Sequence, residues 1–384
     1  MKLSCLQQNL ADGLNVVGRV VPGKSTLPVL SNVLLATDEG RLKLAATNLE
    51  MAMTVWVGAH VESEGAITLP ARVLTEWVLL LDRDQQIELA MNARNKRVRL
   101  QSGRYESNIS GIDAEDFPPI PTVEEGTSIA LEAAVLKDAI GQVAFAAAQD
   151  DSRPVLAGVL VKLEHGKLTL AAADGFRLAV RTVELPNGEE QRLSVIVPAR
   201  AMSELARVLP DEEGKTVELA ATPNRSQILF KLGDVQMVSR LIEGQFPDYA
   251  RIIPQEAKTR ALMPTRELLQ ATRAASVFAR DNSMIVRLNL TPSEDQQELA
   301  LGKVVVSSTS AEMGDNTGDL DATVDGEEQQ VAFNGKYLKE ALEALNAPQV
   351  KLELTGPASP GILRPSGGDS NGYLHVIMPM HVAK

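Results

Sequence analysis

The 384-residue sequence predicts an α+β protein in which one structural unit occurs three times. Residues 28–46 and 154–172 match at ten of nineteen positions, without a gap, at a constant offset of 126. Leu69-Pro70-Ala71-Arg72 recurs as Val197-Pro198-Ala199-Arg200, each time before a helical pattern. Internal repeats of this kind are the sequence signature of repeated structural units.

The first repeat is expected to alternate helices with antiparallel strands. Leu6, Leu10, Leu14 and Val17 recur at helical spacing, whereas the apolar and polar residues of 28–46 alternate around a tight turn. In order, we expect a helix over 5–21, a hairpin over 28–46, a strand over 51–57, a helix over 73–81 and strands over 87–91 and 97–101.

The second and third repeats follow the same order. Prolines at 116–121 cannot lie inside a helix or a central strand and mark a boundary, and Phe246-Pro247 marks the next. We therefore expect domains over 1–122, 123–250 and 251–384. Their helices are expected over 132–148, 201–209, 264–280 and 337–345, and their strands include the hairpin 154–172, 285–290, 303–308 and 373–378.

Composition narrows the class of protein. Cys5 is the only cysteine, so no internal disulfide can form, and this suits a reducing compartment such as the cytoplasm. The N-terminal residues show neither a signal peptide nor a membrane span. Taken for the whole chain, the net charge of −12 argues against non-specific nucleic-acid binding, which usually relies on a basic surface.

The charge is unevenly distributed. The six predicted helices together carry a small net positive charge, so the strands and loops hold the acidic excess. Helices accommodate Lys and Arg well in any protein. The pattern gains meaning only if the helices share one face of an assembly.

No motif asks for catalysis. Residues 18–25 match the phosphate-loop pattern G-x-x-x-x-G-K-S, but a helix precedes them and Pro28 with a β-rich run follows. A phosphate loop needs the reverse order, a strand before and a helix after. The four histidines have no metal-ligand spacing. We therefore expect a protein that is not an enzyme, with no metal and no cofactor.

The repeats suggest how such a chain assembles. Two helices per repeat cover only one side of its strands. Repeats joined end to end would place the helices on one side and leave free sheet edges at the chain ends, where another chain can pair. A second copy would close this arc into a ring, with sheets outside and helices inside.

Four motifs resemble one family. Residues 154–158, 173–178, 244–249 and 375–380 are similar, in this order, to those of the bacterial replicative DNA sliding clamp, the β subunit of DNA polymerase III. The resemblance spans the whole chain and implies three DNA-clamp-type domains. It also implies a head-to-tail homodimer, a six-domain ring around duplex DNA that gives the replicative polymerase its processivity.

The resemblance also implies the partners. Double-stranded DNA would be held without sequence preference, by weak and salt-sensitive attraction to phosphates. Polymerases, the clamp loader and repair proteins would bind through short, partly apolar peptide motifs. The loader, not the clamp, would use ATP, and no membrane is involved.

The resemblance suggests three sets of functional residues. Each DNA-contacting candidate is otherwise an ordinary solvated charge, and the apolar cleft residues are otherwise interior packing. Candidates for DNA contact are Lys24, Arg153, Arg200, Arg207 and Arg273. The peptide cleft would be lined by Leu156, Gly175, Phe176, Arg177, Leu178, Pro247, Arg251, Ile252, Tyr337, Ala358, Pro360, Val376, Met378, Pro379 and Met380. Ile109, Val277 and Phe278 would meet across the dimer interface.

The cleft chemistry is plausible without the resemblance, since Leu, Ile, Val and Met form an adaptable apolar groove. Arg177 and Arg251 are expected to pair with acidic or backbone groups of the peptide. The chain departs from the family at Phe176 and His381, where His and Arg are expected, and at Ala173, where Thr is usual. Peptide preference is therefore not carried over.

Ser107 lies where the family commonly has an aromatic residue, so the strength of ring closure is not carried over either. Two other classes stay open at this stage. A phosphate-loop nucleotide hydrolase would rest on Gly23-Lys24-Ser25. The other is a structural protein of repeated β-rich units that does not bind DNA.

Overall fold

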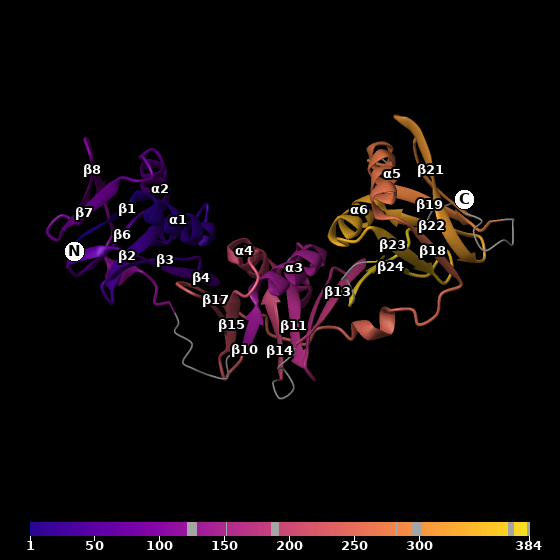
Figure 1. The fold of residues 1–384 in the computed structure, drawn as a ribbon, viewed down its shortest axis with the longest axis horizontal. Helices are drawn as coiled ribbons and strands as arrows, with labels where there is room; N and C mark the ends of the chain where they lie inside the picture. The colour runs from indigo at the N-terminus through magenta and orange to yellow at the C-terminus, as the bar shows by residue number, and fades with distance from the viewer. Residues whose placement is uncertain are drawn as a thin grey trace. The chain divides into compact units, whose positions relative to one another are not determined.

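The computed structural model describes residues 1–120, 129–150, 152–185, 192–280, 283–293, 302–367 and 372–381 (Figure 1). Contacts divide the chain into two compact units. Unit 1 contains 1–137 and 201–241, and unit 2 contains 138–200 and 242–384. The predicted boundary at 122/123 lies outside the described residues. The division passes through helices α3 (Ala133–Val143) and α4 (Ala199–Val208).

Unit 1 contains two antiparallel sheets. The smaller has the order β5 (His60–Ser63), β1 (Lys2–Leu6), β7 (Gln86–Asn92), β8 (Arg97–Ser102), β9 (Tyr105–Ser110). The larger has the order β10 (Ile129–Glu132), β15 (Thr216–Ala221), β16 (Gln227–Leu232), β17 (Val235–Arg240), β4 (Met51–Val57), β3 (Arg41–Thr47), β2 (Asn32–Asp38), β6 (Ala66–Pro70). The pairing of β17 with β4 therefore makes one sheet from strands of two predicted domains.

Two helices cover strands of unit 1 and contact each other, α1 (Gln7–Val17) and α2 (Ala71–Leu79). The predicted stripe is confirmed at Leu10, Leu14 and Val17, which are buried. The helix is shorter than the expected 5–21, because Lys2–Leu6 instead pairs as a strand with β7 and β5. At its other end, the short 3₁₀ helix Gly18–Val20 follows directly.

Unit 2 contains one large antiparallel sheet, which again includes strands of two predicted domains. They meet where β13 pairs with β25. Its order is β14 (Leu193–Pro198), β11 (Gly158–Glu164), β12 (Lys167–Ala173), β13 (Arg177–Glu184), β25 (Tyr373–Ile377), β24 (Gly361–Ser366), β23 (Gln349–Leu354), β18 (Thr259–Pro264), β21 (Gly314–Gly326), β20 (Gly302–Ser310), β19 (Ile285–Thr291), β22 (Gln329–Asn334).

The last two helices, α5 (Thr265–Phe278) and α6 (Gly335–Ala344), pack side by side on the strands of unit 2 (Figure 1). The α5 helix contacts β20 and β21, and α6 contacts β22 and β25. The Asn334 side chain accepts hydrogen bonds from the amides of Lys336 and Tyr337 and so caps α6. Leu338, Ala341 and Leu342 form its buried face.

The two matching hairpins have the same turn. Glu39 and Gly40 connect β2 to β3, and His165 and Gly166 connect β11 to β12, all with positive φ. Two-residue loops of this conformation fit the twist of the flanking strands. The segments Pro28–Ser31 and Pro154–Ala157, expected as strand, are instead 3₁₀ turns. A proline at the first position has no N–H for a ladder and already has a helical φ.

Candidate functional site

An apolar cluster lies in unit 2 where β13 pairs with β25. Its buried members come from five strands of the same sheet and from β25 itself. They are Leu160, Ala171, Leu178, Val180, Ile196, Ile362 and Val376. Partly buried side chains pack against this cluster, several of them from the segment after β17. These are Val155, Ala173, Ile242, Phe246, Tyr249, Ile253 and Leu374.

Apolar side chains remain exposed beside the cluster. The backbone N–H of Met378 donates to the carbonyl of Phe176 at 2.8 Å, which continues the pairing of the two strands by one step. Phe176 is 58% exposed and Met378 is 40% exposed, and Ile252 is exposed as well. The structure therefore brings four predicted cleft residues together, with Leu178 and Val376 buried and Phe176 and Met378 at the surface.

The Arg177 side chain is buried and makes its contacts within the chain. Its side chain is 3% exposed and donates from Nε to Asp174 Oδ2 at 3.1 Å, from Nη2 to the Phe145 carbonyl at 2.7 Å, and from Nη1 to Glu340. The guanidinium also lies over Tyr337, 4.4 Å from the ring centroid. These groups within the chain engage Arg177, so its side chain is not presented to a peptide.

The turn before β13 holds Phe176 in place. Asp174 Oδ1 accepts hydrogen bonds from the amides of Phe176 and Arg177 at 2.8 and 3.0 Å. Gly175 has a φ of +92°, and a Cβ there would lie 2.5 Å from Arg153 Nη1. The backbone conformation favours glycine at this position, whereas the flexible end of the Arg153 side chain could move aside.

His375 precedes Val376 in β25 and is fully buried. Its ring stacks on Phe145 at 5.6 Å between centroids, and the Tyr373 hydroxyl is 3.3 Å from its Nδ1. Burial, and then the positive charge of Arg177, lower the pKa of His375 to about 3. The histidine is therefore neutral at physiological pH, and burial raises the pKa of Tyr373, which keeps its proton too.

The remaining predicted cleft residues lie on several segments. Arg251 is exposed and pairs with Asp248 at 2.8 Å. The Met380 amide donates to the Ala332 carbonyl at 2.8 Å, and the Leu156 amide donates to the Arg153 carbonyl at 2.9 Å. Ala358 and Pro360 lie in the loop between β23 and β24, Pro247 precedes the 3₁₀ helix Tyr249–Ile252, and Pro379 follows β25.

The predicted DNA-contacting residues differ in their surroundings. Arg207 pairs with Glu204 at 2.7 Å, and Arg273 pairs with Glu343 at 2.7 Å. Lys24 is exposed in the loop after the Gly18–Val20 turn, and Arg200 is exposed in the first turn of α4. Arg153 lies against the turn at Gly175.

Two of the three predicted interface residues have side chains that are exposed or half-buried. Val277 is 45% exposed and Phe278 is half-buried at the end of α5. Ile109 is 6% exposed, because β9 pairs with β8 and places this side chain opposite Val98 in the core. Tyr105 at the start of β9 is the exposed aromatic side chain in this region.

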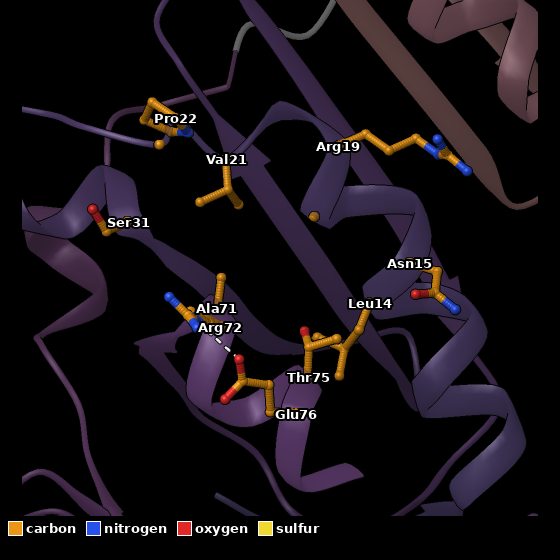
Figure 2. Close-up of a pocket in the computed structure, with 12 residues that line it drawn as sticks. Leu14, Asn15, Arg19, Val21, Pro22, Ser31, Ala71, Arg72, Thr75 and Glu76 are labelled. Carbon is orange, nitrogen blue, oxygen red and sulfur yellow. Dashed lines mark hydrogen bonds and ion pairs between the residues drawn. The ribbon is translucent and has the colours of Figure 1, made fainter. Parts of the chain in front are cut away.

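A cavity of about 840 Å³ lies in unit 1 between α1, the 18–23 segment and α2. Figure 2 shows Val21 and Pro22 on one side of it, and Ala71 and Arg72 at the start of α2 on another. Arg72 Nε pairs across one helical turn with Glu76 at 2.7 Å. The cavity is lined by Leu14, Asn15, Gly18, Arg19, Val21, Pro22, Gly23, Ser31, Ala71, Arg72, Thr75 and Glu76.

The segment that resembles a phosphate loop runs along this cavity, and its context is the predicted one. It follows α1 and leads into the Pro28–Ser31 turn and β2, so no α-helix begins directly after Ser25. The Ser25 hydroxyl instead accepts a hydrogen bond from the Leu27 amide at 3.1 Å. The arrangement that holds phosphates in nucleotide hydrolases is therefore missing here.

In the described ranges, no three His, Cys, Asp or Glu side chains gather closely enough to hold a metal ion. No helix among those residues is long and apolar enough to cross a membrane.

Three family models together match most of the chain. The N-terminal domain of the DNA polymerase III beta subunit matches residues 1–121, its central domain matches 130–248, and its C-terminal domain matches 250–381. The third repeat, the most diverged in sequence, is thus matched like the other two.

Whole proteins and solved structures agree with these matches. The beta sliding clamp of Synechococcus elongatus is 34% identical over 385 residues and that of Bacillus subtilis 28% over 390, covering 100% and 99% of both chains. The crystal structure of the Bacillus subtilis clamp matches all of both chains with a TM-score of 0.92 at 28% identity. The beta subunit of Streptococcus pyogenes does so with 0.91 at 27%. The chain therefore belongs to the beta sliding clamp family, the DNA polymerase III beta subunits that act as non-catalytic processivity factors.

Proposed function

We propose that two copies of this chain join head to tail into a six-domain ring, which encloses duplex DNA and tethers the replicative polymerase to it. The family supports the processivity role, and the repeat supports the ring. Enclosure requires no strong or sequence-specific contact with DNA. A chain with a net charge of −12 can therefore hold DNA without gripping it.

The observation that carries this proposal is a regular strand pairing with two strands left over. The strand β4 pairs with β17, and β13 pairs with β25. In each pair, the strand that follows the repeated hairpin joins the last strand of the next domain. The corresponding strands without such a partner are β21 and β9.

Both leftover strands have a free edge. Among the described strands, β9 pairs only with β8, and residues 314–322 of β21 pair only with β20. A free edge is a template for pairing with another chain. Pairing β9 of one copy with β21 of the other is head to tail, and doing so twice closes a ring.

Charge complements this pairing. Exposed Asp315 and Asp321 lie along β21 on either side of Asp319, which pairs with Lys303. Exposed Arg97 and Arg104 lie in the β8–β9 hairpin. Opposite charges on the two strands would favour their encounter and fix the register. Val277, Phe278 and Tyr105 would supply apolar contact, while Ile109 would support β9 from within the chain.

Inside the ring, we propose that Lys24, Arg153, Arg200, Arg207 and Arg273 attract DNA phosphates. Lys24 and Arg200 are expected to contribute most, since Arg207 and Arg273 are already paired with glutamates. Charge reversal of Lys24 and Arg200 to Glu should weaken loading on DNA, with a larger effect at low salt. Lys167→Glu, a reversal at an exposed strand residue, is the matched control. Unchanged loading at low salt would remove Lys24 and Arg200 from the DNA-contacting set.

The surface beside the apolar cluster is proposed to bind short, partly apolar peptides of polymerases, the clamp loader and repair proteins. The support is the exposure of Phe176, Ile252 and Met378 next to a buried apolar cluster. Met and aromatic side chains adapt to different partners. Met378→Asp should abolish binding of an apolar peptide, and Met313→Asp, at another exposed methionine, should not.

We further infer domain boundaries at 122/123 and 250/251 and a cytoplasmic location. The family matches support the boundaries. The unpaired, buried Cys5 suits a reducing compartment. Limited proteolysis should first cut near 122 and 250, because the boundaries between domains are usually cut most easily.

A further inference from the structure

The turn that precedes β13 occurs in each of the three repeats. Asn48 Oδ1 accepts from the amides of Glu50 and Met51 at 3.0 and 2.8 Å, as Asp174 does from Phe176 and Arg177. In the third repeat, Ser310 Oγ accepts from the amides two and three residues on, at 3.2 and 3.1 Å. The same local hydrogen bonding therefore starts β4, β13 and β21.

The strand junctions beside two of these turns also match. The Arg240 amide donates to the Glu50 carbonyl at 2.8 Å, and the Met378 amide donates to the Phe176 carbonyl at 2.8 Å. The backbone thus makes the same surface twice, once in each unit. Any functional difference between the two must come from side chains.

The residue that ends each turn provides such a difference. It is Met51 in the first repeat, Arg177 in the second and Met313 in the third. Of these three side chains, only the arginine can form an ion pair, and its partner is Glu340 on α6 of the following domain. Phe145 and Tyr337 lie against its guanidinium, at 5.3 and 4.4 Å from their ring centroids.

Glu340 has counterparts in the other repeats, because Glu76, Glu204 and Glu340 lie six residues after Pro70, Pro198 and Asn334. All three pair within their own helix, Glu76 with Arg72, Glu204 with Arg207, and Glu340 with Lys336 at 4.0 Å. Arg19 also approaches Glu204, at 4.0 Å, but it comes from the turn after α1. Within the described chain, Glu340 is the member of this set that pairs with a turn before a strand.

We propose that Arg177 is a positioning residue that prepares the junction of β13 and β25 for peptides. It joins the 174–176 turn to α6 and to the Phe145 carbonyl, and so fixes Phe176 beside Met378. Burying an arginine has a large desolvation cost, which must be offset by hydrogen bonds and ion pairs. Here two carboxylates and a carbonyl supply them. A surface held in its binding conformation loses less entropy on binding.

This role rests on the proposed peptide binding and gives a reason why the Met51 junction should not share it. The test replaces Arg177 with the residue of the first repeat, Arg177→Met, and separately removes the charge of its partner, Glu340→Gln. The probe is a fluorescently labelled peptide rich in Leu and Phe, selected for binding to the wild-type chain. Arg41→Met is the matched control, since Arg41 also pairs with a carboxylate, Asp234, and lies over an aromatic ring, Trp56.

Arg177→Met is expected to weaken the peptide about tenfold or more, and Glu340→Gln severalfold, mainly through faster dissociation. Arg41→Met should bind like the wild type. Hydrogen exchange without peptide should speed up at the amides of residues 176 and 177 in both variants, but not at Glu50 and Met51. Arg177→Lys, which keeps the charge but not the fork of donors, should recover part of the affinity.

Wild-type peptide affinity in folded Glu340→Gln, together with unchanged exchange at 176 and 177, would overturn the role of Arg177. This outcome can be read even if Arg177→Met fails to fold, because Glu340→Gln preserves side-chain shape. If no peptide rich in Leu and Phe binds to the wild-type chain, the proposed peptide-binding surface is itself refuted. The two failures are therefore distinguishable.

Discussion

His375 is enclosed by Phe145, Tyr373 and the β13–β25 junction, and it has no exposed surface. Its Nε2 has no hydrogen-bond partner among the described residues. The nearby guanidinium of Arg177 opposes a second positive charge. Protonating this ring would place an unpaired charge beside another charge in the core.

Stability should therefore fall in acid. The pKa of His375 is about 3 in the folded chain against 6.5 for an ordinary histidine, so between these values the unfolded chain binds the extra proton. The contribution of neutral His375 to the free energy of unfolding is complete above about pH 6.5. It is lost as the pH falls towards 3, at up to ~1.4 kcal/mol per pH unit.

Urea unfolding of the wild type and of His375→Gln between pH 4.5 and 7.5 measures this effect. The free energy of unfolding should depend less steeply on pH in His375→Gln than in the wild type. His165→Gln, at an exposed histidine, should keep the wild-type slope. Equal slopes in wild type and His375→Gln would contradict the assignment.

Two helix glycines give opposite predictions for the same change. A Cβ at Gly13 would lie 2.8 Å from Leu44 Cδ1 and from Val57 Cγ2, because α1 packs closely on β3 and β4. At Gly141 in α3, a Cβ would meet no atom within 4 Å. Gly13→Ala should cost about 1–3 kcal/mol through overpacking, whereas Gly141→Ala should stabilise by roughly 0.5–1 kcal/mol through helix propensity.

Chemical denaturation of both variants checks this pair. The contrast is more informative than either value, since the same methyl is added to a helix in both. A stabilised Gly13→Ala would show that α1 can move away from the sheet.

The site was only partly predictable at the residue scale. Leu178 and Val376 were predicted to line a peptide cleft, and both lie in one buried apolar cluster. Arg177 was expected to face a peptide, but internal groups engage it. Its partner Glu340 is 163 residues away in the sequence. No local pattern identifies a pair at that separation.

Elements with periodic apolar residues were predicted best. The helices α5 and α6 lie within the expected 264–280 and within two residues of the expected 337–345. The long strand β21 was not expected, because its Asp, Gly and Asn residues have weak strand propensity. Its pairing with β20 and β18, and burial of Leu320 and Ala322, decide its conformation.

The pairing proposed between β9 and β21 can be tested by charge reversal at the scale of these strands. Arg97→Glu with Arg104→Glu should weaken the dimer, and so should Asp315→Lys with Asp321→Lys, because each places like charges across the interface. A chain with all four changes should dimerise again, since β9 of one copy meets β21 of the other with the signs exchanged.

Sedimentation of the three variants at micromolar concentration and low salt gives the answer. Paired charge reversals on Arg41 and Asp234, which bond within unit 1, are the control and should leave the dimer intact. The proposed register would be contradicted if the chain with all four changes stays monomeric, or if the variants with two changes dimerise as well as the wild type.

At the scale of the whole molecule, the repeat predicted three domains of one kind, and the family models match three successive domains. The joining of predicted domains into shared sheets, through β4–β17 and β13–β25, was not visible in the sequence. Alternating strands do not reveal which strand lies beside them across a domain boundary.

The most direct test of enclosure is retention on circular DNA. The protein is loaded by its clamp loader with ATP onto a nicked circular plasmid, and the complex is passed through gel filtration at moderate salt. A ring should remain with the circle and should be lost within minutes once a restriction enzyme linearises the plasmid, because it slides off the ends. Equal retention on circular and linear DNA, or none on the circle, would contradict enclosure.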